Sequence, residues 1–143
     1  MKKMLNEIKC RFPSHSENES FSRGLAVSFA SMASPTVCQL ADIKCAVSEA
    51  VTNCIVHAYK DEVGMIELIL RLFEGGELVI IVKDRGIGIE DVETAREPLF
   101  TTDTTGERSG MGFAIMESMM DSVKVKSKAG VGTTVTMKIH VGT

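Results

Sequence analysis

The order of the hydrophobic periodicities constrains the fold of this chain more than any other feature. Residues Leu5 to Phe12 alternate with a period of two and predict a strand at the edge of a sheet. Two segments with helical spacing follow, at about 17–32 and from Ser34 to about Tyr59. Two strand patterns, a polar loop with a further helical pattern, and two more strand patterns complete the chain. This order excludes the strict alternation of a Rossmann fold and favours helices gathered on one face of a sheet.

The four later strand patterns pair into two hairpins. Met65 to Phe73 and Leu78 to Val82 are joined by Glu74-Gly75-Gly76-Glu77, whose glycines permit the positive φ of tight turns. In the second hairpin, one alternating pattern begins at Val123 and another ends at Ile139, and the turn Gly130-Val131-Gly132 lies between them. We therefore expect an α/β protein of the α+β kind, a two-layer sandwich. Its mixed, mostly antiparallel sheet should carry the helices on one face.

Several local signals place the helix boundaries. Ser16 with Glu19 predicts a capping box at the first helix, and Ser34-Pro35 predicts the start of the second. A short helix is expected at 91–96, a polar loop at 97–110 and a helix at 111–120.

Length and composition limit the classes of function. A chain of 143 residues suits one domain over residues 1–143, and its net charge of −3 disfavours direct nucleic-acid binding. No segment approaches the roughly 20 apolar residues of a membrane span, so we expect a cytoplasmic protein. The four cysteines form no C-x-x-C pair, which favours reduced thiols over zinc or disulfides.

Three polar residues recur at a spacing of four in the second helical segment. Glu49, Asn53 and His57 would share one face of an α-helix. The carboxylate can accept a proton from an attacking hydroxyl, and the amide oxygen can coordinate Mg²⁺. The same spacing also fits a solvated helix face. For His57, a contact to phosphate and a packing role both stay open.

A second motif, Asp84-Arg85-Gly86-Ile87-Gly88, directly follows an apolar strand pattern. An acid at a strand end can accept a hydrogen bond from the exocyclic amine of a purine. The glycines let the backbone approach a ring or phosphate without interference from Cβ. A plain turn is the competing interpretation, because D-x-G-x-G is frequent by chance.

A third motif is the glycine-rich stretch from Gly106 to Gly112, which precedes a helical pattern. Free N–H groups and the positive end of a helix dipole suit phosphate groups. Arg108 adds a planar cation, and Thr101 to Thr105 form a polar segment able to close over a ligand. The fourth and weakest motif is Gly130-Val131-Gly132-Thr133, which also fits an ordinary hairpin.

In this order, the four motifs resemble the nucleotide-binding boxes of the GHKL (Bergerat) superfamily. The resemblance spans nearly the whole chain, and the joint match is far more specific than any part. Neither a P-loop nor the motif set of protein kinases occurs. Ser16 to Arg23, Glu49 to Asn53, Pro98 to Thr102 and Glu107 to Phe113 more narrowly resemble the sporulation anti-sigma F factors, a group of serine kinases.

The resemblance implies a role for each candidate residue. Glu49 is implied as the general base, and Arg108 as a catalytic contact to the γ-phosphate. Asn53 is implied as the Mg²⁺ ligand and Arg23 as a contact to partner proteins. The residues implied to bind ATP or ADP are Asn53, Asp84, Gly86, Gly88, Thr101, Thr102, Ser109, Gly110, Met111, Gly112 and Thr133.

The resemblance also implies two coupled activities in the regulation of transcription. A homodimer would sequester an RNA polymerase sigma factor of the sigma-F type. As an ATP-dependent serine kinase, it would also phosphorylate and inactivate an anti-anti-sigma protein. ATP and ADP would bias the choice of partner. Two alternatives are a related stress-response anti-sigma serine kinase and a non-catalytic binding protein switched by nucleotide. The length argues against a complete histidine kinase.

Overall fold

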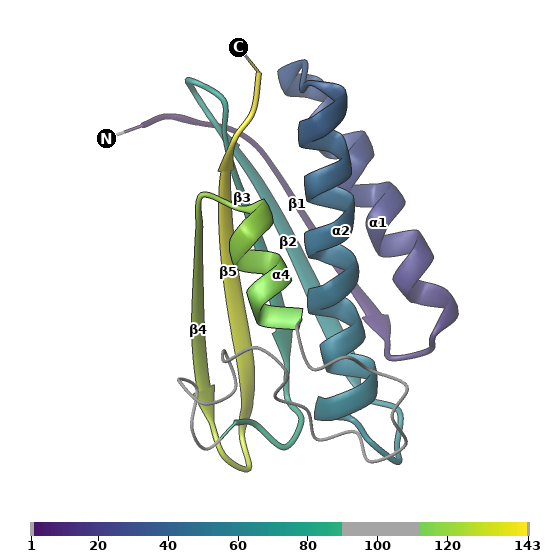
Figure 1. The fold of residues 1–143 in the computed structure, drawn as a ribbon. Helices are drawn as coiled ribbons and strands as arrows, with labels where there is room; N and C mark the ends of the chain where they lie inside the picture. Colours follow the sequence, from purple (N-terminus) through teal and green to yellow (C-terminus); the bar gives the residue numbers. More distant parts are fainter. Residues whose placement is uncertain (1, 90–111, 143) are drawn as a thin grey trace.

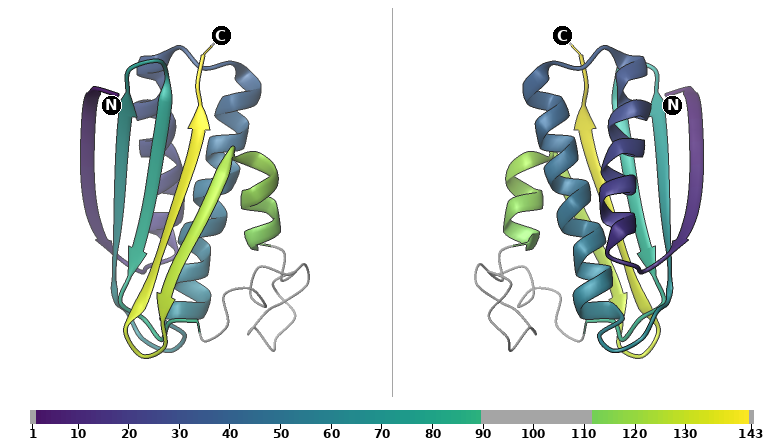
Figure 2. Two further views of the ribbon diagram at one scale, coloured as in Figure 1. Left: turned by 90° about the vertical axis from the view of Figure 1, so that its left-hand side faces the viewer. Right: turned by 90° about the vertical axis from the view of Figure 1, so that its right-hand side faces the viewer.

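The computed structural model describes residues 2–89 and 112–142, and Figure 1 shows helices packed on one face of a sheet. The two side views of Figure 2 show the helices on the same side. This arrangement confirms the expected two-layer α/β sandwich. In chain order the elements are β1 (Met4–Pro13), α1 (Glu17–Ala30), the 3₁₀ turn η1 (Ser31–Ala33), α2 (Val37–Asn53), the π-helical turn η2 (Cys54–Ala58), β2 (Met65–Phe73), β3 (Glu77–Asp84), α4 (Gly112–Met119), β4 (Ser122–Lys128) and β5 (Gly132–His140).

The five strands lie in the order β1-β2-β3-β5-β4. All four pairings between described strands are antiparallel, which confirms the prediction of a mostly antiparallel sheet. Strand β1 lies at an edge, as its pattern predicts. The last hairpin pairs with β3 through β5, so Asp84 at the end of β3 lies opposite Thr133 at the start of β5.

Both predicted hairpins form, and glycines make their turns. Gly75 and Gly76 have φ angles of 87° and 91° between β2 and β3. Gly130 and Gly132 have φ angles of 79° and 146° between β4 and β5. Positive φ strains residues with a Cβ, so these turns depend on glycine.

The main core lies between the sheet and the helices. Alternate residues of the strands face this layer, and one stripe of α2 packs on them. Each fully buried aliphatic side chain contributes about 1.5–3 kcal/mol, so the stripe fixes the rotation of α2 about its axis. Among the largest fully buried side chains are Ile43 and Val47 of α2, Leu68 of β2, Ile80 of β3 and Met137 of β5.

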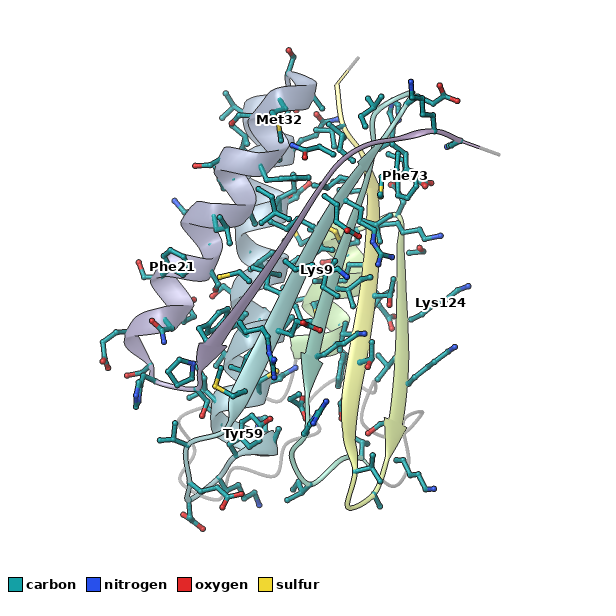
Figure 3. The ribbon with its side chains drawn as sticks, turned by 180° about the vertical axis from the view of Figure 1, so that it is seen from behind. Lys9, Phe21, Met32, Tyr59, Phe73 and Lys124 are labelled. Carbon is teal, nitrogen blue, oxygen red and sulfur yellow. The ribbon has the colours of Figure 1, made fainter. Side chains whose placement is uncertain are left out.

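The opposite face of the sheet has no covering helix among the described elements (Figures 2 and 3). Ile69, Val79 and Ile81 form a small buried cluster there. Charged side chains surround the cluster, including Arg71, whose Nε lies 2.6 Å from Glu7 Oε2. Among the described elements, the alternation of apolar and charged residues thus suits this face of the sheet to contact with water.

The predicted start of α1 at Glu17 is confirmed, but its capping box is wrong, and so is the predicted cap of the second helix. Ser16 is the N-cap of α1, but its hydroxyl makes no capping bond and donates to Glu17 Oε1 instead. Glu19 is engaged by α2, which draws its carboxylate away from the cap. The second helix is capped by Thr36 with Gln39, because Ser34 takes a left-handed conformation before it. Tertiary contacts and turn geometry thus decided how each helix is capped.

Candidate functional site

Glu49 and Asn53 lie one turn apart on α2, beside the first residue of α4. A Cβ atom at Gly112 would lie 3.2 Å from Asn53 Oδ1 and 3.3 Å from Glu49 Oε2. Glycine at this position therefore lets α4 begin close to both polar groups. A carboxylate, an amide oxygen and the N-terminal end of a helix thus lie close together here. The N-terminal end of a helix carries a partial positive charge and favours the binding of anions.

The end of α2 departs from α-helical geometry. Cys54 to Ala58 form a π-helical turn, and Tyr59 N donates to Cys54 O over 3.0 Å, an i→i+5 bond. His57 lies within this π-helical turn, and its place on the same face as Glu49 and Asn53 stays a prediction. Single π turns inside helices are frequent at functional sites.

Asp84, at the end of β3, has its carboxylate held by surrounding donors. Gly86 N donates to Oδ1 over 2.9 Å, and the Cys54 thiol donates to Oδ2 over 3.4 Å. Burial raises the pKa of Asp84 above its ordinary value, while bonds from Gly86, Cys54 and the Thr133 backbone lower it. Burial and the nearby carboxylate also raise the pKa of the Cys54 thiol. The carboxylate is thus half-buried, oriented and available as an acceptor.

The glycines of the Asp84 motif are required by packing within the protein. A Cβ at Gly86 would clash with the backbone carbonyl of Ala58. Gly88 has a φ of 75°, and a Cβ there would clash with the backbone of Lys128. A Cβ at Gly132 would clash with Asp84 O. These glycines bring the end of α2, the loop after β3 and the last hairpin together, and their contact with a ligand stays a prediction.

Thr133 lies beside Asp84 in the β3–β5 ladder and is buried. Its Oγ1 lies 2.7 Å from Ser127 Oγ, which also accepts from Ile89 N over 2.7 Å. Ser127 in turn donates to Gly132 O over 3.0 Å. This chain of hydrogen bonds ties the loop after β3 to the last hairpin, next to the Asp84 carboxylate.

Tyr59, labelled in Figure 3, supports the same loop. Its hydroxyl accepts from Arg85 N over 2.7 Å and donates to Met65 O over 2.7 Å. The ring packs closely on Gly64. Burial raises the pKa of Tyr59, so the phenol stays protonated at neutral pH. Tyr59 therefore links the end of η2, the start of β2 and the residue after Asp84.

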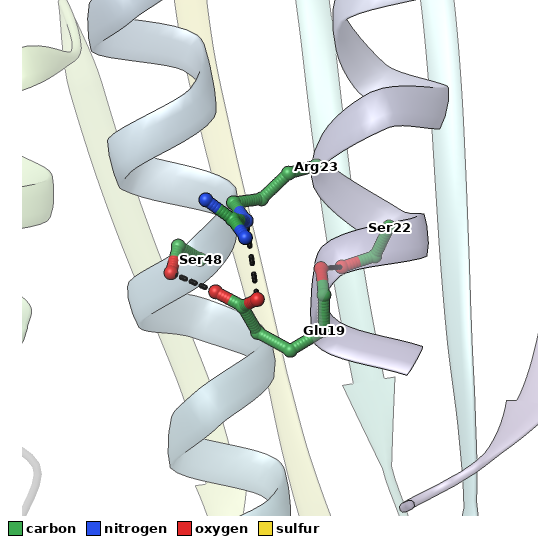
Figure 4. Close-up of polar contacts among 4 residues, drawn as sticks. All are labelled: Glu19, Ser22, Arg23 and Ser48. Carbon is green, nitrogen blue, oxygen red and sulfur yellow. Dashed lines mark hydrogen bonds and ion pairs between the residues drawn. The ribbon is translucent and has the colours of Figure 1, made fainter. Parts of the chain in front are cut away.

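Arg23 points from α1 toward α2 (Figure 4). Its Nε lies 3.1 Å from Glu19 Oε2, and the side chain is about one third exposed. Glu19 also accepts a hydrogen bond from Ser48 of α2, the neighbour of Glu49 in sequence. Arg23 thus belongs to a bridge between the two helices, and its contact with a partner protein stays a prediction.

Six predicted site residues and the short helix expected at 91–96 lie outside the described residues. The six are Thr101, Thr102, Arg108, Ser109, Gly110 and Met111. Of the described candidates, the structure groups Glu49, Asn53 and Gly112 at the start of α4. It groups Asp84, Gly86, Gly88 and Thr133 at the end of β3, and Arg23 lies with neither group.

Sequence reasoning missed Cys54, Tyr59 and Ser127. Cys54 follows Asn53 directly, but a buried thiol has no motif of its own. Tyr59 and Ser127 contact the loop only through pairings between distant segments. The one usable signal is that Cys54 directly follows Asn53.

Within residues 2–89 and 112–142 no group of three or more His, Cys, Asp or Glu could hold a metal. Asn53 Oδ1, beside the start of α4, is an oxygen ligand of the kind Mg²⁺ prefers. No helix in the described part of the chain is long and apolar enough to cross a membrane.

Comparisons with known proteins find extensive similarity. The family described as "Histidine kinase-like ATPase domain" matches residues 12–139. An "Anti-sigma F factor" of Clostridium acetobutylicum is 50% identical over 133 residues, covering 93% of this chain and 92% of the relative. Proteins of the same name from Thermoanaerobacter sp. (strain X514) and Geobacillus kaustophilus are 47% and 48% identical. Each alignment covers 96% of this chain, and 95% and 94% of the relatives.

Solved structures share the fold. The RsbU and RsbW domains of Rv1364c from Mycobacterium tuberculosis align with a TM-score of 0.69 at 18% identity, covering 96% of this chain and 33% of that one. The histidine kinase domain of the blue-light activated kinase EL346 from Erythrobacter litoralis aligns with a TM-score of 0.56 at 26% identity. That alignment covers 73% of this chain and 46% of the kinase domain.

Proposed function

Because the chain belongs to the anti-sigma F factor family and carries a histidine kinase-like ATPase domain, we propose that it is an ATP-dependent serine kinase that also sequesters a sigma factor. The sigma factor is of the sigma-F type, and the phosphorylated protein is its anti-anti-sigma antagonist. The observation that carries the kinase assignment is the meeting of Glu49, Asn53 and Gly112 at the start of α4.

Different residues of the chain have different roles in the proposed phosphoryl transfer. Glu49 accepts the proton of the attacking serine hydroxyl, and Asn53 holds Mg²⁺ through its amide oxygen. ATP would donate its γ-phosphoryl group to the serine oxygen and leave as ADP, and Mg²⁺, when bound, would neutralise charge on the phosphate oxygens. The start of α4, with Ser109 to Gly112, cradles the phosphates, and Arg108 contacts the γ-phosphate.

Base recognition lies at the other group of residues. Asp84 accepts a hydrogen bond from the exocyclic amine of adenine, and Thr133 contributes a polar contact on the same side. Support comes from the orientation of the Asp84 carboxylate, which is held by donors at both oxygens. Gly86 and Gly88 shape the loop below the base, and Thr101 and Thr102 close over the nucleotide.

Partner binding involves α1. We assign Arg23 as a contact to the sigma factor or the antagonist, and a homodimer as the functional state in the cytoplasm. The bridge from Arg23 through Glu19 to Ser48 ends one residue from Glu49, which supports communication between partner and nucleotide. A nucleotide can bias partner choice only through different interaction energies with the two complexes.

The test follows transfer of labelled γ-phosphate from ATP with Mg²⁺ to a purified anti-anti-sigma protein. Glu49→Gln and Asn53→Ala should abolish acid-stable labelling of the partner's serine. Glu74→Gln makes the same chemical change at the exposed β2–β3 turn, at the other end of the sheet, and should leave transfer unchanged. Tight ATP binding without transfer would instead favour a non-catalytic binding switch.

A further inference from the structure

We propose that Cys54 is a positioning residue for recognition of the purine amine, because its thiol orients the carboxylate of Asp84. The inference rests on the proposed role of Asp84 in nucleotide binding. Cys54 would not touch the nucleotide. It would act through the acceptor that does.

The geometry fixes the carboxylate at both of its oxygens. The Cys54 thiol donates to Oδ2 over 3.4 Å, while Gly86 N donates to Oδ1 over 2.9 Å. Rotating the carboxylate about its bond to Cβ would break both bonds. An ionised carboxylate has about four acceptor positions, so capacity for a ligand donor remains. The acceptor is therefore oriented before a base arrives, and less ordering is left for binding.

The position of Cys54 in the fold is suited to this task. Cys54 is only 4% exposed and begins the π-helical turn at the end of α2. Its neighbour Asn53 faces the start of α4, whereas Cys54 faces the end of β3. Asn53 thus contacts the group proposed to bind the phosphates. The next residue, Cys54, contacts the group proposed to bind the base.

The alternative is that Cys54 only fills space in the core. A filler affects the binding of every nucleotide alike, because it acts through the general shape of the site. A positioning donor affects only ligands whose amine reaches Asp84. The two roles therefore differ in how a Cys54 substitution changes selectivity between ligands.

The experiment measures dissociation constants by calorimetry for ATP and for purine riboside triphosphate, which lacks the 6-amino group. Cys54→Ala removes the donor and should weaken ATP binding about two- to tenfold, the range expected for one net hydrogen bond. Binding of the analogue should change by less than about twofold on the same reasoning. Cys54→Ser retains a donor and should recover most of the preference for ATP.

Controls separate this inference from the loss of fold and from the proposed function. Cys38→Ala removes an exposed thiol at the start of α2 and should change neither constant. Urea unfolding of each variant checks the fold. Equal weakening of both ligands by Cys54→Ala, or no weakening, overturns the positioning role alone. A wild-type protein that does not prefer ATP over the analogue overturns the assignment of Asp84 as well.

Discussion

Replacing Tyr59 by Phe tests how the loop after Asp84 is held. The substitution keeps the buried ring and removes only the hydroxyl, which bonds Arg85 N and Met65 O, each over 2.7 Å. Each lost bond reduces stability by about 1 kcal/mol net, so the free energy of unfolding should fall by about 2 kcal/mol. For a chain of this size, that fall corresponds to a decrease in Tm of about 4–8 °C.

The assay is urea unfolding of wild type and Tyr59→Phe, with an unchanged m-value as the condition for a simple stability change. Ser31→Ala is the control, because it removes an exposed hydroxyl that bonds Val27 O and should alter stability by less than about 0.5 kcal/mol. A loss below about 0.5 kcal/mol for Tyr59→Phe would refute the reasoning, since water would then replace the hydroxyl.

The pH dependence gives a second check on Tyr59. Burial raises the pKa of the Tyr59 phenol in the folded protein above its value in the unfolded chain. The protonated phenol therefore makes its full contribution to the free energy of unfolding at any pH below the unfolded pKa. This contribution is lost as the pH rises through the folded pKa. The gap in stability between wild type and Tyr59→Phe should therefore narrow in alkaline solution. A constant gap would contradict this assignment.

Four further substitutions test other parts of the structure. Gly24→Ala, exposed on α1 with open space around it, should raise the free energy of unfolding by about 0.5–1 kcal/mol. Gly88→Ala, at a φ of 75° against the backbone of β4, should lower it by about 1–3 kcal/mol. A lower urea midpoint for Gly24→Ala would contradict the first prediction, and an unchanged or higher midpoint for Gly88→Ala would contradict the second. Burial raises the pKa of Asp84, so the stability given by its bound proton is lost as the pH rises through the folded pKa. In the ligand-free protein, Asp84→Asn should therefore gain stability relative to wild type as the pH rises from about 3 to about 7, and a flat difference would count against it. Ser48→Ala removes the bond to Glu19 between α1 and α2 and should reduce stability by about 1 kcal/mol in urea; an unchanged midpoint would show that the bond contributes nothing.

Much of the fold was predictable because its signals are local. The alternation in β1 and the glycine turns at Gly75-Gly76 and Gly130 to Gly132 depend on neighbouring residues only. The helix starts were less predictable. Glu19 was expected to cap α1 but bonds to Ser48, a competition that exists only when the two helices pack.

The residues of the candidate site were predictable where they belong to short sequence motifs. Spacing along one helix aligned Glu49 with Asn53, but it could not predict that the helix ends in a π-helical turn that contains His57. The spacing also could not predict that Gly112 lies beside these two residues, because that contact joins segments about 60 residues apart in sequence.

The sequence by itself determined the kinds of elements, the two hairpins and the chemistry-bearing residues, since periodicity, turn glycines and motifs act over a few neighbouring positions. Only the tertiary structure decided which of these residues meet. The pairing of β3 with β5 places Thr133 beside Asp84, and the packing of α2 on the sheet brings Cys54 to the same carboxylate. Such contacts depend on strand order and helix rotation, which are set by burial of the whole core rather than by any local pattern.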